Sequence, residues 1–203
     1  MLKQAFINSS LQFSNNNSLI EKYWQEIEKK YSAKKRFYHN QLHLQYFLNE
    51  LLICKDQIKD WDMIVFALFY HDIIYNPAKK DNEEKSAELA VQRLISLLVP
   101  NDRIEICKNH ILATKSHTVS TNNDTNLFTD ADLTILGSEW PIYESYYKKI
   151  RKEYSIYPEF MYNKGRKKVL EHFLKMERIF KTDFFFSKYE VQARKNLKLE
   201  LNT

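Results

Sequence analysis

Apolar residues recur at helical spacing along most of this chain. Residues 18–31 place Ile20, Trp24 and Ile27 on one face, and residues 18–21 have the pattern of a capping box. Asp60 precedes a strongly apolar stretch that Asn76-Pro77 ends. Further periodic stretches, separated by polar links, predict helices at about 40–52, 83–99, 103–117, 127–137, 138–154, 167–180 and 183–201.

This pattern predicts an all-α fold. The chain contains only 2 Gly and 4 Pro, too few for the many tight turns of a hairpin-rich sheet protein. Its 203 residues are typical of one domain with a substantial core. Residues 8–18 are rich in Asn and Ser, so we expect residues 1–17 to form a flexible leader. Residues 18–203 are then expected to form a single helical bundle.

The charge pattern argues against a nucleic-acid polymer as a partner. The net charge is +5, but most Lys and Arg lie beside Glu or Asp, which is typical of a solvated helix face. A mildly basic surface instead favours a small phosphorylated molecule. The sequence leaves the oligomeric state open.

Two features predict a cytoplasmic protein without membrane association. The N-terminal residues show no signal peptide, and no apolar run is long enough to cross a bilayer. Cys54 and Cys107 lie in apolar helical contexts, which are more typical of buried thiols than of a disulfide.

The candidate chemistry begins at His71 and Asp72, which end the apolar helix. Burying an unpaired imidazole and carboxylate costs several kcal/mol, comparable to the net stability of a whole domain. A divalent cation is the simplest compensation. The alternative is a His–Asp pair that is hydrogen-bonded within the protein.

Two other predicted helices carry inward-facing ligands. His43 lies four residues before Phe47 on the apolar side of its helix, and Asp132 shares a face with three apolar residues. With His71 and Asp72 they form a set of two imidazoles and two carboxylates, which suits a borderline or hard divalent ion. Such an ion lowers the pKa of a bound water and supplies hydroxide near neutral pH.

The order of these side chains resembles the HD superfamily of metal-dependent phosphohydrolases. Tyr70-His71-Asp72 matches the pair that names the superfamily, and residues 129–133 resemble its Ala-Asp motif. Residues 38–43 are similar to the first metal motif of the cyclic-nucleotide phosphodiesterases, a distant branch. The chain resembles more closely a bacterial family of predicted HD phosphohydrolases, through segments 36–40, 71–75, 81–87, 113–117, 130–137 and 190–197.

The resemblance implies an HD-type helical bundle and a role for each matching residue. His39 would match the proton-donating histidine of the phosphodiesterases. The doubled acid leaves Asp130 as an alternative ligand, but Asp132 follows Ala131 and faces the apolar side, which favours Asp132. Asp130 would then stabilise the first turn of its helix. The implied metal ligands are His43, His71, Asp72 and Asp132.

The implied reaction is hydrolysis of a phosphoester or phosphoanhydride bond by metal-activated water. A nucleotide is the substrate class that the resemblance favours, and the ion would be Mn²⁺, Mg²⁺, Co²⁺, Zn²⁺ or iron. Proton transfer would fall to His39 or Asp81.

Five further residues each allow a functional and a structural interpretation. His117 would contact phosphate, bind a second metal or cap a helix. Asp81 and Glu83 would hold metal-bound water, or only cap the following helix. Arg36 and Arg194 would fork onto phosphate oxygens, or form surface ion pairs.

Two other functions fit the same motifs. One is an HD-fold di-iron oxygenase, which needs additional ligands that His117, His110 and Asp130 would supply. The other is a module that binds a nucleotide as a sensor without cleaving it.

Overall fold

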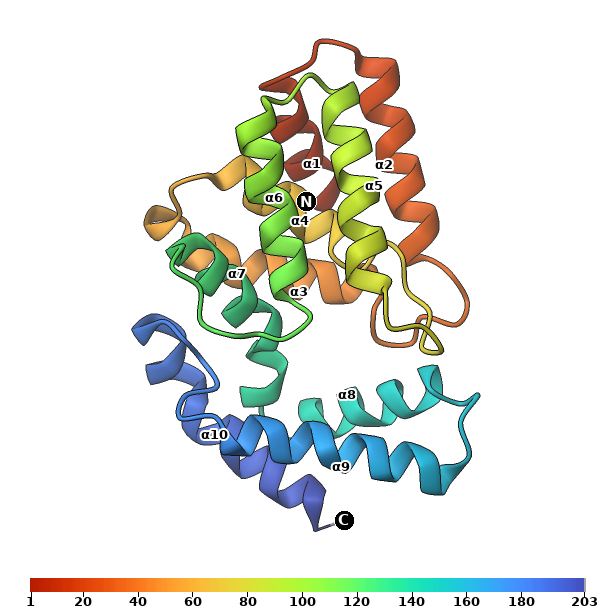
Figure 1. Ribbon diagram of the computed structural model, residues 1–203, viewed down its shortest axis with the longest axis vertical. Coiled ribbons are helices and arrows are strands. Elements are labelled where there is room, and N and C mark those ends of the chain that lie inside the picture. The colour runs from red at the N-terminus through yellow and green to blue at the C-terminus, as the bar shows by residue number, and fades with distance from the viewer. Residues whose placement is uncertain (203) are drawn as a thin grey trace.

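The computed structural model describes residues 1–202 (Figure 1), and every regular element within them is helical. The predicted all-α fold is therefore confirmed. Two short 3-10 helices are η1 (Lys55–Gln57) and η2 (Thr134–Gly137). The α-helices are α1 (Leu2–Leu11), α2 (Asn17–Tyr31), α3 (Gln41–Ile53), α4 (Trp61–Tyr70), α5 (Asn82–Ser96), α6 (Asn101–Ala113), α7 (Asn123–Leu133), α8 (Trp140–Glu153), α9 (Glu159–Lys175) and α10 (Asp183–Leu201).

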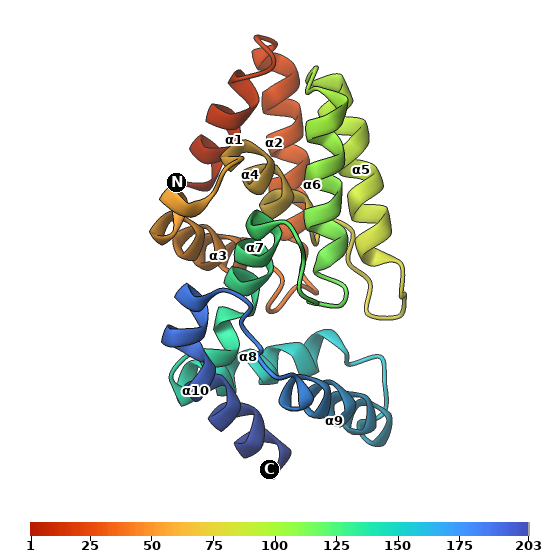
Figure 2. The same cartoon turned by 60° about the vertical axis from the view of Figure 1, so that its left-hand side comes forward.

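The helices form two layers, which Figures 1 and 2 show one above the other. The upper layer contains α1 to α7, and α4 lies in its middle, packed against α1, α3, α5 and α6. Every residue from Met63 to Tyr70 is buried. The lower layer contains α8, α9 and α10, in which α10 packs against α9 and η2, and α8 packs against η2.

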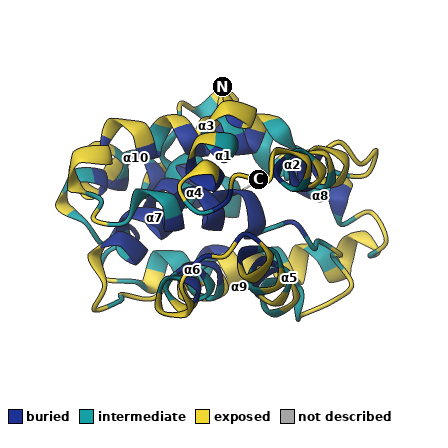
Figure 3. Cartoon of the chain, turned by 90° about the horizontal axis from the view of Figure 1, so that it is seen from above, coloured by how far each residue is buried: buried dark blue, intermediate teal, exposed yellow. Residues whose placement is uncertain are grey.

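Buried residues concentrate where the helices face one another, as Figure 3 shows from above. Side-chain N-caps are present on two helices that carry the site: Asn40 accepts a hydrogen bond from the amide of Leu42, and Asp60 accepts one from the amide of Met63. None of the described helices combines the length and apolar character that a membrane-spanning segment needs.

The predicted flexible leader is corrected by helix α1. Phe6 is fully buried, and its ring lies edge-on to Phe66 and Phe69 at centroid distances of 6.0 and 5.6 Å. The Asn-rich and Ser-rich composition is misleading because Ser9 and Ser10 are buried and not exposed to solvent. The Ser10 hydroxyl donates a hydrogen bond to the Phe6 carbonyl. Residues 1–17 therefore belong to the upper layer.

Helix α7 starts earlier than predicted. Asn122 caps it by accepting from the Asp124 amide, so the helix begins at Asn123 and not near residue 127. Asp130 consequently lies in the eighth position of the helix. The prediction that Asp130 stabilises the first turn is wrong, because that turn lies about 10 Å away along the helix axis at 1.5 Å per residue.

Buried carboxylates join segments that are distant in sequence. Asp124 accepts the backbone amides of residues 59 and 60, and Asp130 accepts those of residues 181 and 182. Glu153 accepts the amides of residues 38 and 39, and Glu190 accepts those of residues 179 and 180. Each pair of amides lies outside the α-helices, so the carboxylates fix connections that no helical hydrogen bond would hold.

The two glycines provide a matched test of the packing between layers. A Cβ on Gly137 would lie 2.7 Å from both the Cβ and the carbonyl oxygen of Tyr189, whereas nothing lies within 4 Å of one on Gly165. We expect Gly137→Ala to reduce the free energy of unfolding by about 1–3 kcal/mol through overpacking. Gly165→Ala, inside α9, should raise it by about 0.5–1 kcal/mol. Urea denaturation measures both, and equal effects would contradict the close packing of η2 on α10.

Candidate metal centre

His71 follows the last turn of α4 and presents one ring nitrogen to the site. The side chain is buried, and its Nδ1 lies 2.8 Å from the Leu68 carbonyl oxygen. A carbonyl only accepts hydrogen bonds, so Nδ1 carries a proton and Nε2 is the atom directed at the other candidate ligands. A backbone carbonyl in this role is a common way to orient a metal-binding histidine.

His43 and Asp132 meet His71 from two other helices. His43 Nε2, from α3, lies 3.3 Å from His71 Nε2. Asp132 Oδ1, from α7, lies 3.5 Å from His43 Nε2 and 4.0 Å from His71 Nε2. The three ligand atoms all lie within 4.8 Å of one another, so one cation placed among them would contact all three. The chain therefore brings together a His–His–Asp cluster that could hold a metal ion.

Asp72 adds a second carboxylate at the edge of this cluster. Its Oδ2 lies 3.2 Å from His71 Nε2 and 3.7 Å from His39 Nε2. Together the donors comprise two buried imidazoles and two carboxylates, the set expected for a borderline or hard divalent ion.

The electrostatics of the cluster indicate where a cation would act. Burial opposes a charge on His71, but Asp72 and Asp132 outweigh it and raise the pKa of His71 to about 9. Burial raises the pKa of Asp132 to about 6, and burial lowers the pKa of His43 well below its usual value. The carboxylates thus draw one positive charge into the cluster, and a metal ion would supply that charge in place of the proton on His71.

His39 is held by Glu153, a residue that sequence reasoning missed. His39 Nδ1 lies 2.6 Å from Glu153 Oε2, and the backbone amides of Tyr38 and His39 donate to the other carboxylate oxygen. Tyr75 also donates its hydroxyl to Oε2. Glu153 ends α8 within a charged stretch, so nothing local in the sequence marks it as buried.

The contacts of His39 favour its protonated form. Burial works against the imidazolium, but Asp72 and Glu153 overcome it, so the pKa of His39 is raised. With Nδ1 bound to Glu153, the Nε2 atom faces Asp72 and the metal ligands. His39, the predicted proton donor, thus lies beside the cluster and not within it.

His117 lies on the opposite side of Asp132. Its Nε2 is 3.9 Å from Asp132 Oδ2, and its backbone φ of 51° turns the chain out of α6. Burial and, to a smaller extent, Lys181 lower the pKa of His117 to about 3, so the ring is neutral. A neutral ring suits a metal or hydrogen-bonding role better than the predicted role of a cation at a helix end.

Asp130 lies outside the cluster. Its two oxygens accept four hydrogen bonds, two from backbone amides and two from the Lys181 ammonium and the Thr182 hydroxyl, at 2.8 to 3.1 Å. Because residues two positions apart on a helix point in nearly opposite directions, Asp130 faces the segment before α10 and Asp132 faces the cluster. The predicted preference for Asp132 over Asp130 agrees with this geometry.

The two predicted phosphate-binding arginines are used elsewhere. Arg36 donates to the carbonyls of His39 and Ile73, and Arg194 donates to Glu190 and to three carbonyls between residues 174 and 177. Neither lines the cavities at the cluster. Both arginines therefore hold chain segments together, which corrects their assignment as substrate contacts.

The two acids at the start of α5 differ in their positions. Glu83 lines the cavity over the cluster. Asp81 does not, and it forms an ion pair with Lys85 at 2.8 Å. Of the two, Glu83 is the one placed to hold water near the ligands.

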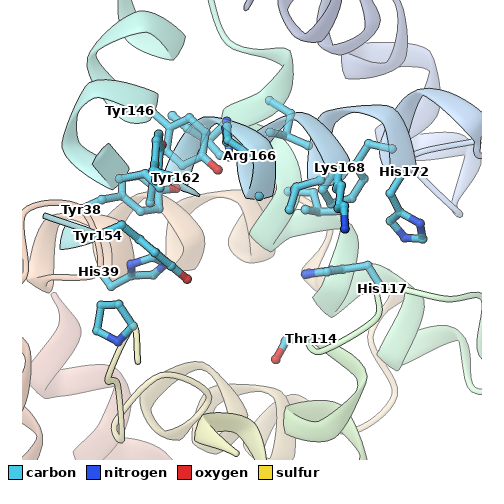
Figure 4. A pocket seen from close by; sticks show the side chains of 18 of the residues that line it. Tyr38, His39, Thr114, His117, Tyr146, Tyr154, Tyr162, Arg166, Lys168 and His172 are labelled. Atoms are coloured by element: carbon cyan, nitrogen blue, oxygen red, sulfur yellow. The ribbon is translucent and has the colours of Figure 1, made fainter. Parts of the chain in front are cut away.

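Two adjacent cavities open onto the cluster. A polar one of about 430 Å³ lies between α5, α6 and the candidate ligands, and its lining includes Lys79, Lys80 and Thr114. A larger one of about 710 Å³ lies between the upper layer and helices α8 and α9, and Figure 4 shows its side chains. Both are lined by His39, Thr114, Lys115, His117, Asp132 and Tyr154.

Comparisons of the chain with protein-family models, with curated proteins and with solved structures found no match. The geometry of the side chains alone therefore identifies this cluster as one that could hold a metal ion.

The contrasting surroundings of Asp130 and Asp132 predict opposite effects of one substitution. Asp132→Asn should reduce affinity for Mn²⁺ or Zn²⁺ by more than tenfold, because an amide replaces a carboxylate ligand. Asp130→Asn should keep metal affinity but lose about 3 kcal/mol or more of stability, because it leaves the Lys181 ammonium buried without its anion. Metal titration below the unfolding temperature measures the first effect, and urea denaturation the second. Metal loss from the Asp130 variant alone would reverse the assignment.

Metal affinity should rise with pH. Between about pH 7 and 8.5 a bound ion must displace the proton on His71, whose pKa is raised to about 9, so Kd should fall about tenfold per pH unit. Below pH 6 the dependence should steepen, because Asp132 also holds a proton there. Calorimetric titrations in buffers of different ionisation enthalpy count the released protons. A Kd that stays constant from pH 7 to 8.5 would contradict this linkage.

Proposed function

We propose that this protein is a metal-dependent phosphohydrolase that cleaves a phosphoester or phosphoanhydride bond of a small phosphorylated molecule. The observation that carries the proposal is the convergence of His43, His71 and Asp132 at the base of a cavity lined by lysines. The order of the same residues along the chain, which resembles the HD superfamily, is consistent with the proposal.

His43, His71, Asp72 and Asp132 would hold a divalent ion, from α3, from the end of α4 and from α7. Such an ion would supply a water of lowered pKa and positive charge for the phosphoryl oxygens. His39 presents Nε2 to the same space, and Glu153 keeps its pKa raised and its ring oriented. His39 then delivers a proton to the oxygen that leaves phosphorus.

The cationic side chains around the cluster favour an anionic substrate. Lys79 and Lys80 line the polar cavity, Lys168 lines the larger one, and none of the three forms an ion pair within residues 1–202. Three unpaired ammonium groups around a metal site would neutralise phosphate oxygens as charge develops on them.

The di-iron oxygenase alternative receives less support. Of the extra ligands that it requires, Asp130 binds Lys181 and Thr182, and His110 is buried with its Nδ1 2.8 Å from the Thr125 hydroxyl oxygen. Only His117 approaches the cluster. The nucleotide-sensor alternative uses the same cavity and differs only in the absence of turnover.

The compartment is proposed to be the reducing cytoplasm. Cys54 and Cys107 are both buried and unpaired, which supports the prediction of free thiols. Burial raises the pKa of both thiols, so neither is poised for reaction.

Phosphatase assays on the purified protein test the proposal directly. Nucleoside mono-, di- and triphosphates would be incubated with protein loaded with Mn²⁺, Mg²⁺, Co²⁺, Zn²⁺ or Fe²⁺. We expect phosphate or diphosphate release that chelation abolishes and metal restores. No turnover with any ion, by protein that demonstrably binds metal, would reject the phosphohydrolase and leave the sensor.

The roles of His39 and Glu153 predict a loss of rate without a loss of metal. His39→Ala should lower kcat about 10²–10⁴-fold, the range for a general acid–base group, while metal content stays unchanged. Glu153→Gln should lower kcat by a smaller factor and shift the acid–base pH profile to lower pH, because the imidazolium loses its anion. Elemental analysis with steady-state kinetics separates these effects, and metal loss in His39→Ala would make His39 a ligand.

A further inference from the structure

One wall of the larger cavity consists of tyrosine rings. It is lined by Tyr38, Tyr146, Tyr154, Tyr157 and Tyr162, and Figure 4 shows four of them gathered at one end. The rings of Tyr154 and Tyr157 are nearly parallel, at 27°, with centroids 6.2 Å apart. The Tyr162 hydroxyl is buried and has no hydrogen-bond partner within residues 1–202. Such a wall suits a planar ring with polar groups on its edge.

Arg166 supports this tyrosine wall from behind. It forms a two-point ion pair with Glu200 at 2.7 and 2.9 Å, and its guanidinium lies 5.4 Å from the centre of the Tyr146 ring. Glu200 also accepts a hydrogen bond from Tyr143. Because α8, α9 and α10 are tied together at this point, the tyrosine end of the cavity is preformed and not dependent on a ligand.

The other end of the cavity is cationic. Figure 4 shows Lys168 and His172 there, close to His117 and across from the tyrosines. The only acidic side chain in the lining of the larger cavity is Asp132. The adjoining polar cavity contains Lys79 and Lys80 together with Asp72 and Glu83. With a metal ion balancing the carboxylates, the lysines of the two cavities would suit an anion of more than one charge.

The candidate metal ligands lie between the two ends. His39, beside the tyrosines, has its Nε2 3.7 Å from Asp72 Oδ2. His117, beside Lys168, has its Nε2 3.9 Å from Asp132 Oδ2. A molecule with its ring at the tyrosine end and a phosphoryl group at the metal ligands still has cationic space beyond. A monophosphate would leave that space unused.

The geometry points to a nucleoside di- or triphosphate as the ligand of this cavity, a proposal that rests on the phosphohydrolase function proposed above. The nucleobase stacks in the tyrosine end, one phosphoryl group lies at the metal ligands, and the remaining phosphate charge lies toward Lys79, Lys80 and Lys168. The tyrosine wall is thus a ring subsite, and the lysines form an anion subsite.

Binding measurements in a His39→Ala background, where turnover is suppressed, test the ring subsite. The probes are the four common ribonucleoside triphosphates and inorganic triphosphate, titrated into Mn²⁺-loaded protein. We expect at least one nucleoside triphosphate to bind more tightly than inorganic triphosphate. Tyr162→Ala should weaken that nucleotide about 5- to 150-fold, the range for loss of one stacking ring, and leave inorganic triphosphate unchanged. Tyr162→Phe, which keeps the ring, should restore most of the affinity.

The anion subsite is tested by comparing the monophosphate and the triphosphate of one nucleoside. The triphosphate should bind about tenfold or more tightly than the monophosphate, since each charged hydrogen bond to an additional phosphate contributes at this level. The double variant Lys79→Ala/Lys80→Ala should remove most of that difference. Matched controls are Lys34→Ala/Lys35→Ala and Tyr46→Ala, which change exposed residues outside these two cavities.

The outcomes separate this proposal from the function on which it rests. Tyrosine-dependent and lysine-dependent binding without turnover in the wild type supports the ligand and rejects the hydrolase. Equal binding of inorganic triphosphate and all nucleotides overturns the ring subsite. Equal binding of mono- and triphosphates overturns the anion subsite, whatever the protein hydrolyses.

Discussion

The hydrogen bond between His71 and the Leu68 carbonyl determines what the centre of this protein can do. Helix α4 is buried along its whole apolar length, so the polar residues at its end must be satisfied inside the fold. Once Nδ1 is bound to its own helix, only Nε2 remains, and it faces His43 and Asp132. Helices α3 and α7 thus meet α4 around one shared charge, and the cavities open where the three meet.

Sequence periodicity predicted this centre because the relevant side chains lie on apolar helix faces. His43, His71 and Asp132 each interrupt a face that otherwise buries aliphatic or aromatic groups. Such an interruption is visible without knowledge of the fold. The helix phase also favoured Asp132 over Asp130, although the start of α7 was misplaced by four residues.

The errors share one physical cause, which is pairing between distant segments. Composition predicted a flexible leader because the fit of Phe6 against α4 leaves no local mark. Arg36 and Arg194 were predicted to contact substrate, because the backbone carbonyls that they actually bind come near them only in the folded chain. Glu153 was missed for the same reason, since its amide partners lie 114 and 115 residues away. Buried carboxylates that collect loop amides are inconspicuous in a sequence rich in surface charge.

Glu153, at the end of α8, lies between two parts of the protein that would have different roles. The residues that would hold the ion lie between positions 43 and 132, whereas most of the tyrosine wall and Lys168 lie on the hairpin of α8 and α9. If the protein has the proposed function, recognition and chemistry are encoded in largely separate stretches, which meet at Glu153 and where Tyr38 packs against Tyr146. Exchanging the hairpin between related chains would alter which molecule is accepted while the reaction persists, provided that the acid at position 153 is retained. Changes of substrate preference among such proteins would therefore be expected to arise from substitutions in the lower layer.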